Sequence, residues 1–212
     1  MPLDNLLALR RAAFRPPTTD SKHSLRVYLN LAARLELTGS NQLWIADLTY
    51  IRLRDEFVYL AVVLDRWSRK VIGWRLSRSL QSAVAVDALQ QALESRRPPP
   101  GLVHRSDRGI QYASEEYTSI LSAHGVLPSM SRAGNPWDNA ACESFMKTLK
   151  AEQIDGTHYL TLEDLQRDMA AFLDGYYNTR RLHSSLGYRP PEEFEQQQEA
   201  AAAAAVMEFS EA

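Results

Sequence analysis

The stretch LWIADLTYIRLRDEFVYLAVVLDRWSRKVIGWRL, residues 43–76, decides the fold class. It contains three runs rich in aromatic and β-branched residues, at 43–51, 57–65 and 69–76, and such runs favour strands. The connections between the runs are only a few residues long, whereas parallel strands need a crossover of a dozen residues or more. The three strands are therefore predicted to form an antiparallel meander.

Beyond the meander, helices and short strands alternate. Apolar residues recur at helical spacing over 82–95, and the run Pro98–Gly101 ends this helix. The crossover through it should lay the next strand, 102–104, parallel to the first strand. The sequence thus predicts an α/β domain with a five-stranded mixed sheet, an antiparallel meander plus two parallel strands, flanked by helices. The remaining predicted elements are a helix at 114–124, a strand at 126–130 and helices at 138–151 and 161–178.

Composition and charge narrow the class of protein. Of the 212 residues, 45% are hydrophobic and 24% charged, which is typical of a globular protein, and no run of 18 apolar residues is present. The single cysteine, Cys142, cannot form an internal disulfide, and the first residues lack the apolar region of a signal peptide, so a cytoplasmic location is expected. The net charge is −2, but six glutamates and no Lys or Arg lie in 190–212, which leaves +4 on 1–189. Such a body tolerates a polyanionic partner without requiring one.

The chain divides into three segments. Residues 1–40 are basic and contain the breaker-rich stretch 15–20, which predicts an arm or linker. Residues 41–195 form the patterned body with its C-terminal helix. Residues 196–212 are an acidic tail rich in Ala, Gln and Glu, whose alanine run 200–205 can form a helix but has nothing obvious to pack on.

Three acidic residues lie where this topology could bring them together. Asp47 is in the middle of the first strand, Asp107 follows the fourth strand, and Glu143 lies one turn into a helix. A carboxylate in a strand costs desolvation free energy unless a cation or a donor compensates it. Three carboxylates without a matching base would form an oxygen cage for Mg²⁺ or Mn²⁺. Two such ions about 4 Å apart would stabilise the attacking and leaving oxygens of a displacement at phosphorus.

Each acid also has a structural interpretation. Asp47 could hydrogen-bond Thr49 or a neighbouring strand end, Asp107 could form an Asx turn before Gly109, and Glu143 could be a first-turn helix acid facing water. Taken singly, these interpretations are the better ones. The 35 residues that separate Asp107 from Glu143 weaken them when the three acids are taken together.

Several blocks of the chain, in order, carry a family resemblance. They are Trp44–Ile51, Leu64–Arg69, His104–Gly109, Ser131–Ala140 and Tyr177–His183. With these blocks the chain resembles a DDE transposase of the retroviral-integrase superfamily and, more narrowly, an OrfB-type transposase of the insertion-sequence-three family, over about 41–195. The resemblance implies an RNase-H-like fold in which Asp47, Asp107 and Glu143 are catalytic and bind two Mg²⁺ or Mn²⁺ ions. The implied activity is that of a polynucleotidyl transferase, which cleaves DNA strands and transfers them during transposition and integration.

Basic side chains that follow Glu143 are candidate DNA contacts. Lys147 and Lys150 share a helical face with Glu143, and in integrase-like proteins cations at these spacings touch the DNA end; the alternative is a solvated stripe. His104 could steer a phosphate or simply pack.

Two further groups of side chains are candidates. Arg132 and Asn135 lie in a polar loop before the catalytic helix, where a DNA contact is plausible. Arg180 and Arg181, with His183, form a basic cluster after the last helix that could bind phosphate or cap the helix C-terminus.

The resemblance also implies partners. These are the DNA of transposon ends and target, further copies of the chain on that DNA, and a separately encoded helix-turn-helix protein of the OrfA type, at a bacterial nucleoid. Only 40 residues precede the core and no helix-turn-helix pattern is found in them, so we expect the catalytic part of a frameshift product or a truncated copy. Two alternatives remain open, an RNase-H-like nuclease and a non-catalytic remnant with a DNA-binding or regulatory role.

Overall fold

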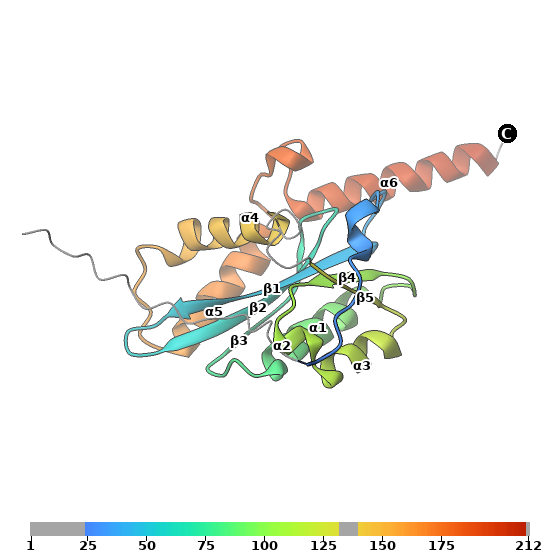
Figure 1. Ribbon diagram of the computed structural model, residues 1–212. Helices are drawn as coiled ribbons and strands as arrows, with labels where there is room; N and C mark the ends of the chain where they lie inside the picture. The colour runs from blue at the N-terminus through green and yellow to red at the C-terminus, as the bar shows by residue number, and fades with distance from the viewer. Residues whose placement is uncertain (1–23, 132–139, 211–212) are drawn as a thin grey trace, which may run out of the picture.

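A five-stranded sheet in the order β3-β2-β1-β4-β5 lies at the centre of the protein (Figure 1). The structure is a computed structural model that describes residues 24–131 and 140–210. β1 pairs antiparallel with β2, and β2 with β3, whereas β4 runs parallel to β1 and β5 parallel to β4. The predicted mixed sheet is therefore confirmed. The strands are β1 (Leu43–Arg52), β2 (Phe57–Asp65), β3 (Val71–Ser77), β4 (Val103–Ser106) and β5 (Leu127–Met130).

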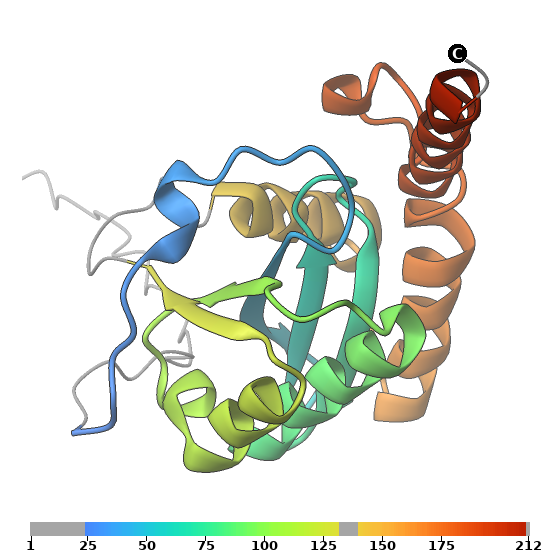
Figure 2. The ribbon, with the colours of Figure 1, turned by 90° about the vertical axis from the view of Figure 1, so that its right-hand side faces the viewer.

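Helices cover both faces of the sheet (Figure 2). On one face lie α1 (Ser82–Arg96), α2 (Ile110–Ala113) and α3 (Glu115–Ala123). On the other lie α4 (Ala140–Leu149) and α5 (Leu162–Phe172). Each of the latter two continues into a π-helical turn, η3 (Lys150–Ile154) and η4 (Leu173–Tyr177). Two short 3₁₀ turns, η1 (Leu31–Arg34) and η5 (Ser184–Leu186), and the long helix α6 (Pro191–Ser210) complete the fold.

The alternation of side chains along β1 builds two hydrophobic cores. Ile45 points to the face covered by α4 and α5, where Phe145 and Met169 are buried. Trp44, one residue earlier, points to the opposite face and packs with Leu89 of α1. Every residue of β1 from Leu43 to Ala46 is buried, because the strand lies between two helical layers. The next residue of the strand, Asp47, therefore lies in an apolar environment.

Several boundaries differ from the sequence prediction. The fourth strand was expected at 102–104 and runs from Val103 to Ser106, because parallel pairing with β5 continues to its end. The predicted helix 161–178 is α-helical only to Phe172 and then π-helical. The short α2 was not predicted. The part of helix 138–151 before Ala140 lies outside the described residues.

The turn between β2 and β3 rests on a single polar side chain. The buried carboxylate of Asp65 accepts hydrogen bonds from the backbone N–H groups of Asn41, Trp67 and Ser68 at 2.7–3.1 Å. These bonds hold the β2–β3 turn against the start of β1. Asp65 is thus an organising residue of the block Leu64–Arg69.

The last helix is anchored at its start. Arg96 of α1 forms a two-pronged ion pair with Glu195, and Lys70 Nζ lies 2.8 Å from Glu192 Oε1. Beyond this anchor, α6 extends away from the body (Figure 1), and its alanines are exposed. In the described part of the chain, no helix is both long and apolar enough to span a membrane.

Part of the segment expected to be an arm packs on the body. The Leu31 N–H donates to Ser129 Oγ of β5 at 2.9 Å, and Ala32 is buried against the sheet. Residues 1–23, the rest of this segment, lie outside the described residues.

Candidate active site

The sheet register brings two of the three acids level with each other. In the parallel β1–β4 pair, Leu43 lies opposite Val103 and Ile45 opposite Arg105. Continued for two residues, this register places Asp47 opposite Asp107. Side chains two residues apart share a face, so both acids lie on the face that α4 covers.

Backbone donors fix both carboxylates. Asp107 Oδ1 accepts the Gly109 N–H at 2.8 Å, which is the predicted Asx turn. A Cβ at Gly109 would lie 2.9 Å from that same oxygen, so a larger residue here would displace the carboxylate of Asp107. Asp47 Oδ1 accepts the N–H of Leu48 at 2.9 Å, and not the Thr49 hydroxyl considered from the sequence.

The third acid, Glu143 of α4, acts on Asp47 through its charge. The pKa of Asp47 is raised to about 7, mainly because burial disfavours its charged form, and further because Asp107 and Glu143 add negative charge nearby. The Leu48 N–H and the Lys150 ammonium oppose this rise in the pKa. The structure therefore brings the three carboxylates into one electrostatic cluster.

The cluster is wider than a closed metal cage. Glu143 is exposed on the first turn of α4, and among the described residues no three His, Cys, Asp or Glu side chains lie close enough to hold one ion. The donor set nevertheless fits a hard divalent cation, because all three groups are carboxylates and their mutual repulsion is what a cation would relieve.

Lys147 of α4 and Lys150, the first residue of η3, follow Glu143 at helical spacing. Lys147 is exposed one turn after Glu143. Lys150 Nζ lies 5.4 Å from the ring centre of Tyr50, a residue of β1, and its charge lowers the pKa of Asp47. Lys150 is thus close enough to Asp47 to act on its charge, whereas Lys147 faces solvent.

His104 packs in the core. Its side chain is 1% exposed, and its Nε2 lies 3.0 Å from the Tyr117 hydroxyl on α3. Burial lowers the pKa of His104 to about 4, so the ring is neutral. The odd separation from Asp107 turns His104 to the opposite face of the sheet. The phosphate contact considered from the sequence is therefore wrong for this residue.

The remaining predicted DNA contacts divide into three cases. Arg181 is held by the carboxylate of Glu152 through bonds of 2.7–3.0 Å, so its charge is compensated. Arg180 is exposed. Arg132 and Asn135 lie outside the described residues.

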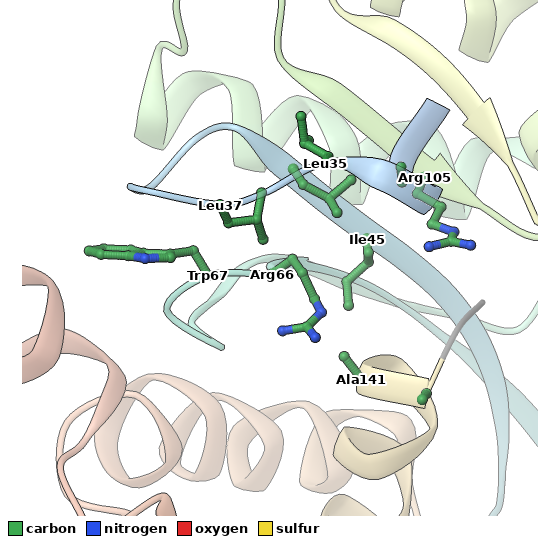
Figure 3. A pocket seen from close by; sticks show the side chains of 10 residues that line it. Leu35, Leu37, Ile45, Arg66, Trp67, Arg105 and Ala141 are labelled. Carbon is green, nitrogen blue, oxygen red and sulfur yellow. The ribbon is translucent and has the colours of Figure 1, made fainter. Parts of the chain in front are cut away.

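Sequence reasoning missed a group of arginines beside the acids. A pocket of about 450 Å³ lies next to the cluster, between the segment that holds Ala32, the start of β1 and the start of α4. Figure 3 shows Arg66, from the β2–β3 turn, and Arg105, from β4, at this pocket. Burial lowers the pKa of Arg66, and the charges of Arg69 and Arg105 lower it further. The position of Arg105 two residues before Asp107 was the available signal.

Two family models match the chain. The Integrase core domain family matches residues 38–136, and a second Integrase core domain family matches 124–191. The chain belongs to the integrase core family. Together the two matches include the strands, α4, α5 and all three acids.

Relatives of this integrase core are transposases of insertion sequences. The transposase of element IS904 from Lactococcus lactis is 43% identical over 158 residues, which cover 74% of this chain and 62% of the relative. Transposase InsF of IS3A from Escherichia coli is 41% identical over 180 residues, which cover 84% of this chain and 62% of the relative. The aligned part of the chain thus spans under two thirds of the length of these relatives.

Solved structures show the same fold. The integrase core superposes on a chain of the simian T-cell lymphotropic virus intasome, in complex with a PP2A regulatory subunit, with a TM-score of 0.62, 16% identity and coverage of 84% of this chain and 61% of that one. The HTLV-2 integrase catalytic core domain, in complex with magnesium, gives a TM-score of 0.55 at 16% identity, covering 80% of this chain and 99% of that one. The RNase-H-like fold is thereby confirmed.

Proposed function

We propose that this integrase core is the catalytic part of an IS3-type transposase, a metal-dependent polynucleotidyl transferase. Asp47, Asp107 and Glu143 would be its catalytic, metal-binding residues. The observation that carries the proposal is the buried carboxyl of Asp47, whose pKa is raised mainly by burial and further by the charges of Asp107 and Glu143, in a chain 41% identical to an IS3 transposase. A carboxyl group perturbed by burial and by like charges is typical of an active site.

Each acid has a distinct task in this proposal. Asp47 lies on β1 and Asp107 directly after the adjacent β4, while Glu143 lies at the start of α4 and would complete the ligand set for two Mg²⁺ or Mn²⁺ ions. When bound, these ions would supply the positive charge that stabilises the attacking and leaving oxygens at phosphorus. Asp47 must lose its proton to act as a ligand, and the nearby Lys150 favours that loss.

Lysines and arginines near the acids would bind the substrate. Lys147 is exposed and Lys150 lies beside Asp47, so both are placed to meet the phosphates of a DNA end. We retain Arg132 and Asn135, from the segment before α4, and the exposed Arg180 as proposed contacts. Arg181 would first have to leave Glu152.

The domain division and the partners follow from the same proposal. The catalytic core would extend over 41–195, between the segment 1–40 and the tail 196–212. Its partners would be the DNA of the element ends and the target, further copies of the chain on that DNA, and a separate OrfA-type protein that recognises the ends. The site of action would be the nucleoid in the bacterial cytoplasm.

A strand-transfer assay tests the proposal. Oligonucleotide duplexes that end in the element's own termini are incubated with the protein and Mg²⁺, and joined products are resolved on a gel. Asp47→Asn, Asp107→Asn and Glu143→Gln should each abolish cleavage and joining, because an amide is a poor ligand for a hard cation. The exposed Glu163→Gln on α5 loses the same charge and should keep activity. Full activity in any variant of the three acids would refute the assignment, and cleavage of RNA–DNA hybrids without joining would favour a nuclease.

A further inference from the structure

A second pocket lies on the other flank of α4 and takes no part in the chemistry described above. Its volume is about 410 Å³, and it is enclosed by α4, the β2–β3 turn and the chain that follows η4. The polar groups that matter for its chemistry are Arg69, His183 and the hydroxyls of Ser144, Thr148, Ser184 and Ser185. None of the residues that the structure places around it is an Asp or a Glu.

Arg69 gives the pocket an uncompensated positive charge. Among the described residues, its guanidinium has neither a hydrogen bond nor an ion pair, whereas the second arginine at the pocket, Arg181, is already held by Glu152.

His183 contributes a buried nitrogen that lacks a partner. Its Nε2 is shielded from solvent and has no hydrogen bond in the described structure. The ring is fixed, because it packs edge-on against Tyr177 at 5.0 Å, and the backbone of His183 bridges to Arg189. Buried polar atoms are nearly always hydrogen-bonded, so an unpaired nitrogen beside two arginines points to an anionic ligand. Burial lowers the pKa of His183, and the positive charges of Arg181 and Arg69 lower it further. A bound anion would offset the effect of these two charges.

We propose that this pocket binds one backbone phosphate of DNA, with Arg69 supplying the charge and His183, Ser144 and Thr148 supplying hydrogen bonds. The inference rests on the proposed function, because it takes DNA as the substrate. Ser144 directly follows Glu143, so the two side chains lie about 100° apart around α4. A helix is about 10 Å across with its side chains, so a DNA strand that crosses the exposed side of α4 at Lys147 can meet both the acids and the pocket.

The rim of the pocket favours DNA over a free anion. Tyr188 is 72% exposed and Leu182 is 59% exposed, and both line the pocket. An exposed aromatic ring and an apolar side chain beside a phosphate site suit the sugar and base of a nucleotide, since bases stack on aromatic side chains. Inorganic phosphate would gain nothing from these two residues.

Binding measurements without catalysis test the charge of the pocket. Wild type, Arg69→Gln, Arg69→Lys and Arg167→Gln are titrated into a fluorescein-labelled DNA duplex in EDTA, and anisotropy is followed over a range of salt. Arg167 is a matched control, because it is an exposed arginine on α5 whose ion-pair partner among the described residues is Asp164. Arg69→Gln should bind about tenfold more weakly at low salt, with a salt slope reduced by about 0.9, the value for one lost phosphate contact. Arg69→Lys and Arg167→Gln should stay near wild type, and equal binding of Arg69→Gln and Arg167→Gln would overturn the proposal.

A crosslink locates the contact and separates it from the proposed function. The photoreactive residue p-benzoylphenylalanine is placed at Ser185, on the rim, and at the exposed Gln90 of α1 as a control. Irradiation should crosslink the duplex only at 185, and Arg69→Gln should remove that crosslink. DNA binding with no crosslink at 185 would overturn the pocket assignment and leave the proposed function standing. If inorganic phosphate, added before irradiation, prevents the crosslink as effectively as unlabelled duplex at an equal concentration of phosphate groups, the pocket is a site for free anions. A chain that binds no DNA would overturn both this proposal and the proposed function.

Discussion

Asp47 carries an electrostatic cost in the folded protein. Its pKa is raised to about 7 from an ordinary value of 3.8, so the folded protein holds a proton there that the unfolded chain releases above pH 4. Stability therefore falls as the pH rises from about 4 to 7, and the ionised carboxylate destabilises the metal-free protein above that range. A cation at the site would remove this cost.

The first prediction follows from that charge. In EDTA at pH 8, Asp47→Asn should raise the free energy of unfolding by about 2–4 kcal/mol, because the neutral amide avoids both burial of a charge and repulsion by the other acids. Urea denaturation measures the difference. Glu163→Gln, on the exposed side of α5, should change it little. A less stable Asp47→Asn protein would mean that the carboxylate is satisfied without a cation.

His104 gives the second prediction, a pH dependence. Its pKa falls from 6.5 to about 4 on folding, so the folded state binds fewer protons there than the unfolded state between these values. The stability from its neutral ring is complete above pH 6.5 and is lost as the pH falls towards 4. Between pH 7 and 4.5, wild type should lose about 2–3 kcal/mol more than His104→Gln, measured by urea denaturation. Parallel losses in the two proteins would show that His104 is not buried as a neutral ring.

Individual residues show where sequence reasoning succeeded and failed. Spacing and chemistry selected the three acids without a structure. The choice for His104 stayed open, although its odd separation from Asp107 already placed the two on opposite faces. The hydrogen-bond partner of His104 is Tyr117 of α3. The pattern of residues along a strand contains no information on which helix residue will contact it.

At the scale of elements, Asn178 joins the end of η4 to the sheet. Its Oδ1 accepts the Val71 N–H at 2.9 Å and its Nδ2 donates to the Val71 carbonyl at 2.8 Å, so it imitates a neighbouring strand at the edge of β3. The two residues are 107 positions apart. The sequence could therefore not reveal this contact, although Asn178 lies in a block that carried the family resemblance.

The third prediction concerns this contact. Asn178→Ala leaves two buried backbone groups unpaired and should destabilise the protein by about 2–4 kcal/mol. The neighbouring Thr179→Ala, which removes only an exposed hydroxyl bond to the Gly175 carbonyl, should cost less than about 1 kcal/mol. Thermal unfolding of both variants measures the contrast. Similar melting temperatures would show that Asn178 does not hold the edge strand.

The tail gives the fourth prediction. Deletion of 196–212 removes three glutamates, Glu199, Glu208 and Glu211, but leaves Glu192 and Glu195, which anchor α6 to Lys70 and Arg96. The shortened protein should therefore melt near the wild-type temperature and bind duplex DNA more tightly at low salt. Anisotropy with a duplex of unrelated sequence measures the affinity. Unchanged binding would show that the tail does not repel DNA.

For the whole molecule, hydrophobic periodicity was enough to predict the architecture. The strands β1 to β3 have long apolar runs with short connections, and these allow only a meander. Periodicity could not predict the π-helical turns after α4 and α5, because they depend on how each helix end meets the rest of the chain. It also missed the pocket at Arg69, whose walls come from three distant parts of the sequence.

The central claim is that three carboxylates spread over 97 positions of the chain, Asp47 to Glu143, form one metal site. A crystal of the protein soaked in Mn²⁺ and measured for anomalous scattering tests it most directly. The account predicts manganese peaks about 2.1 Å from carboxylate oxygens of Asp47 and Asp107, with Glu143 drawn in as a further ligand. Manganese bound elsewhere, with these three side chains left apart and unligated, would contradict it.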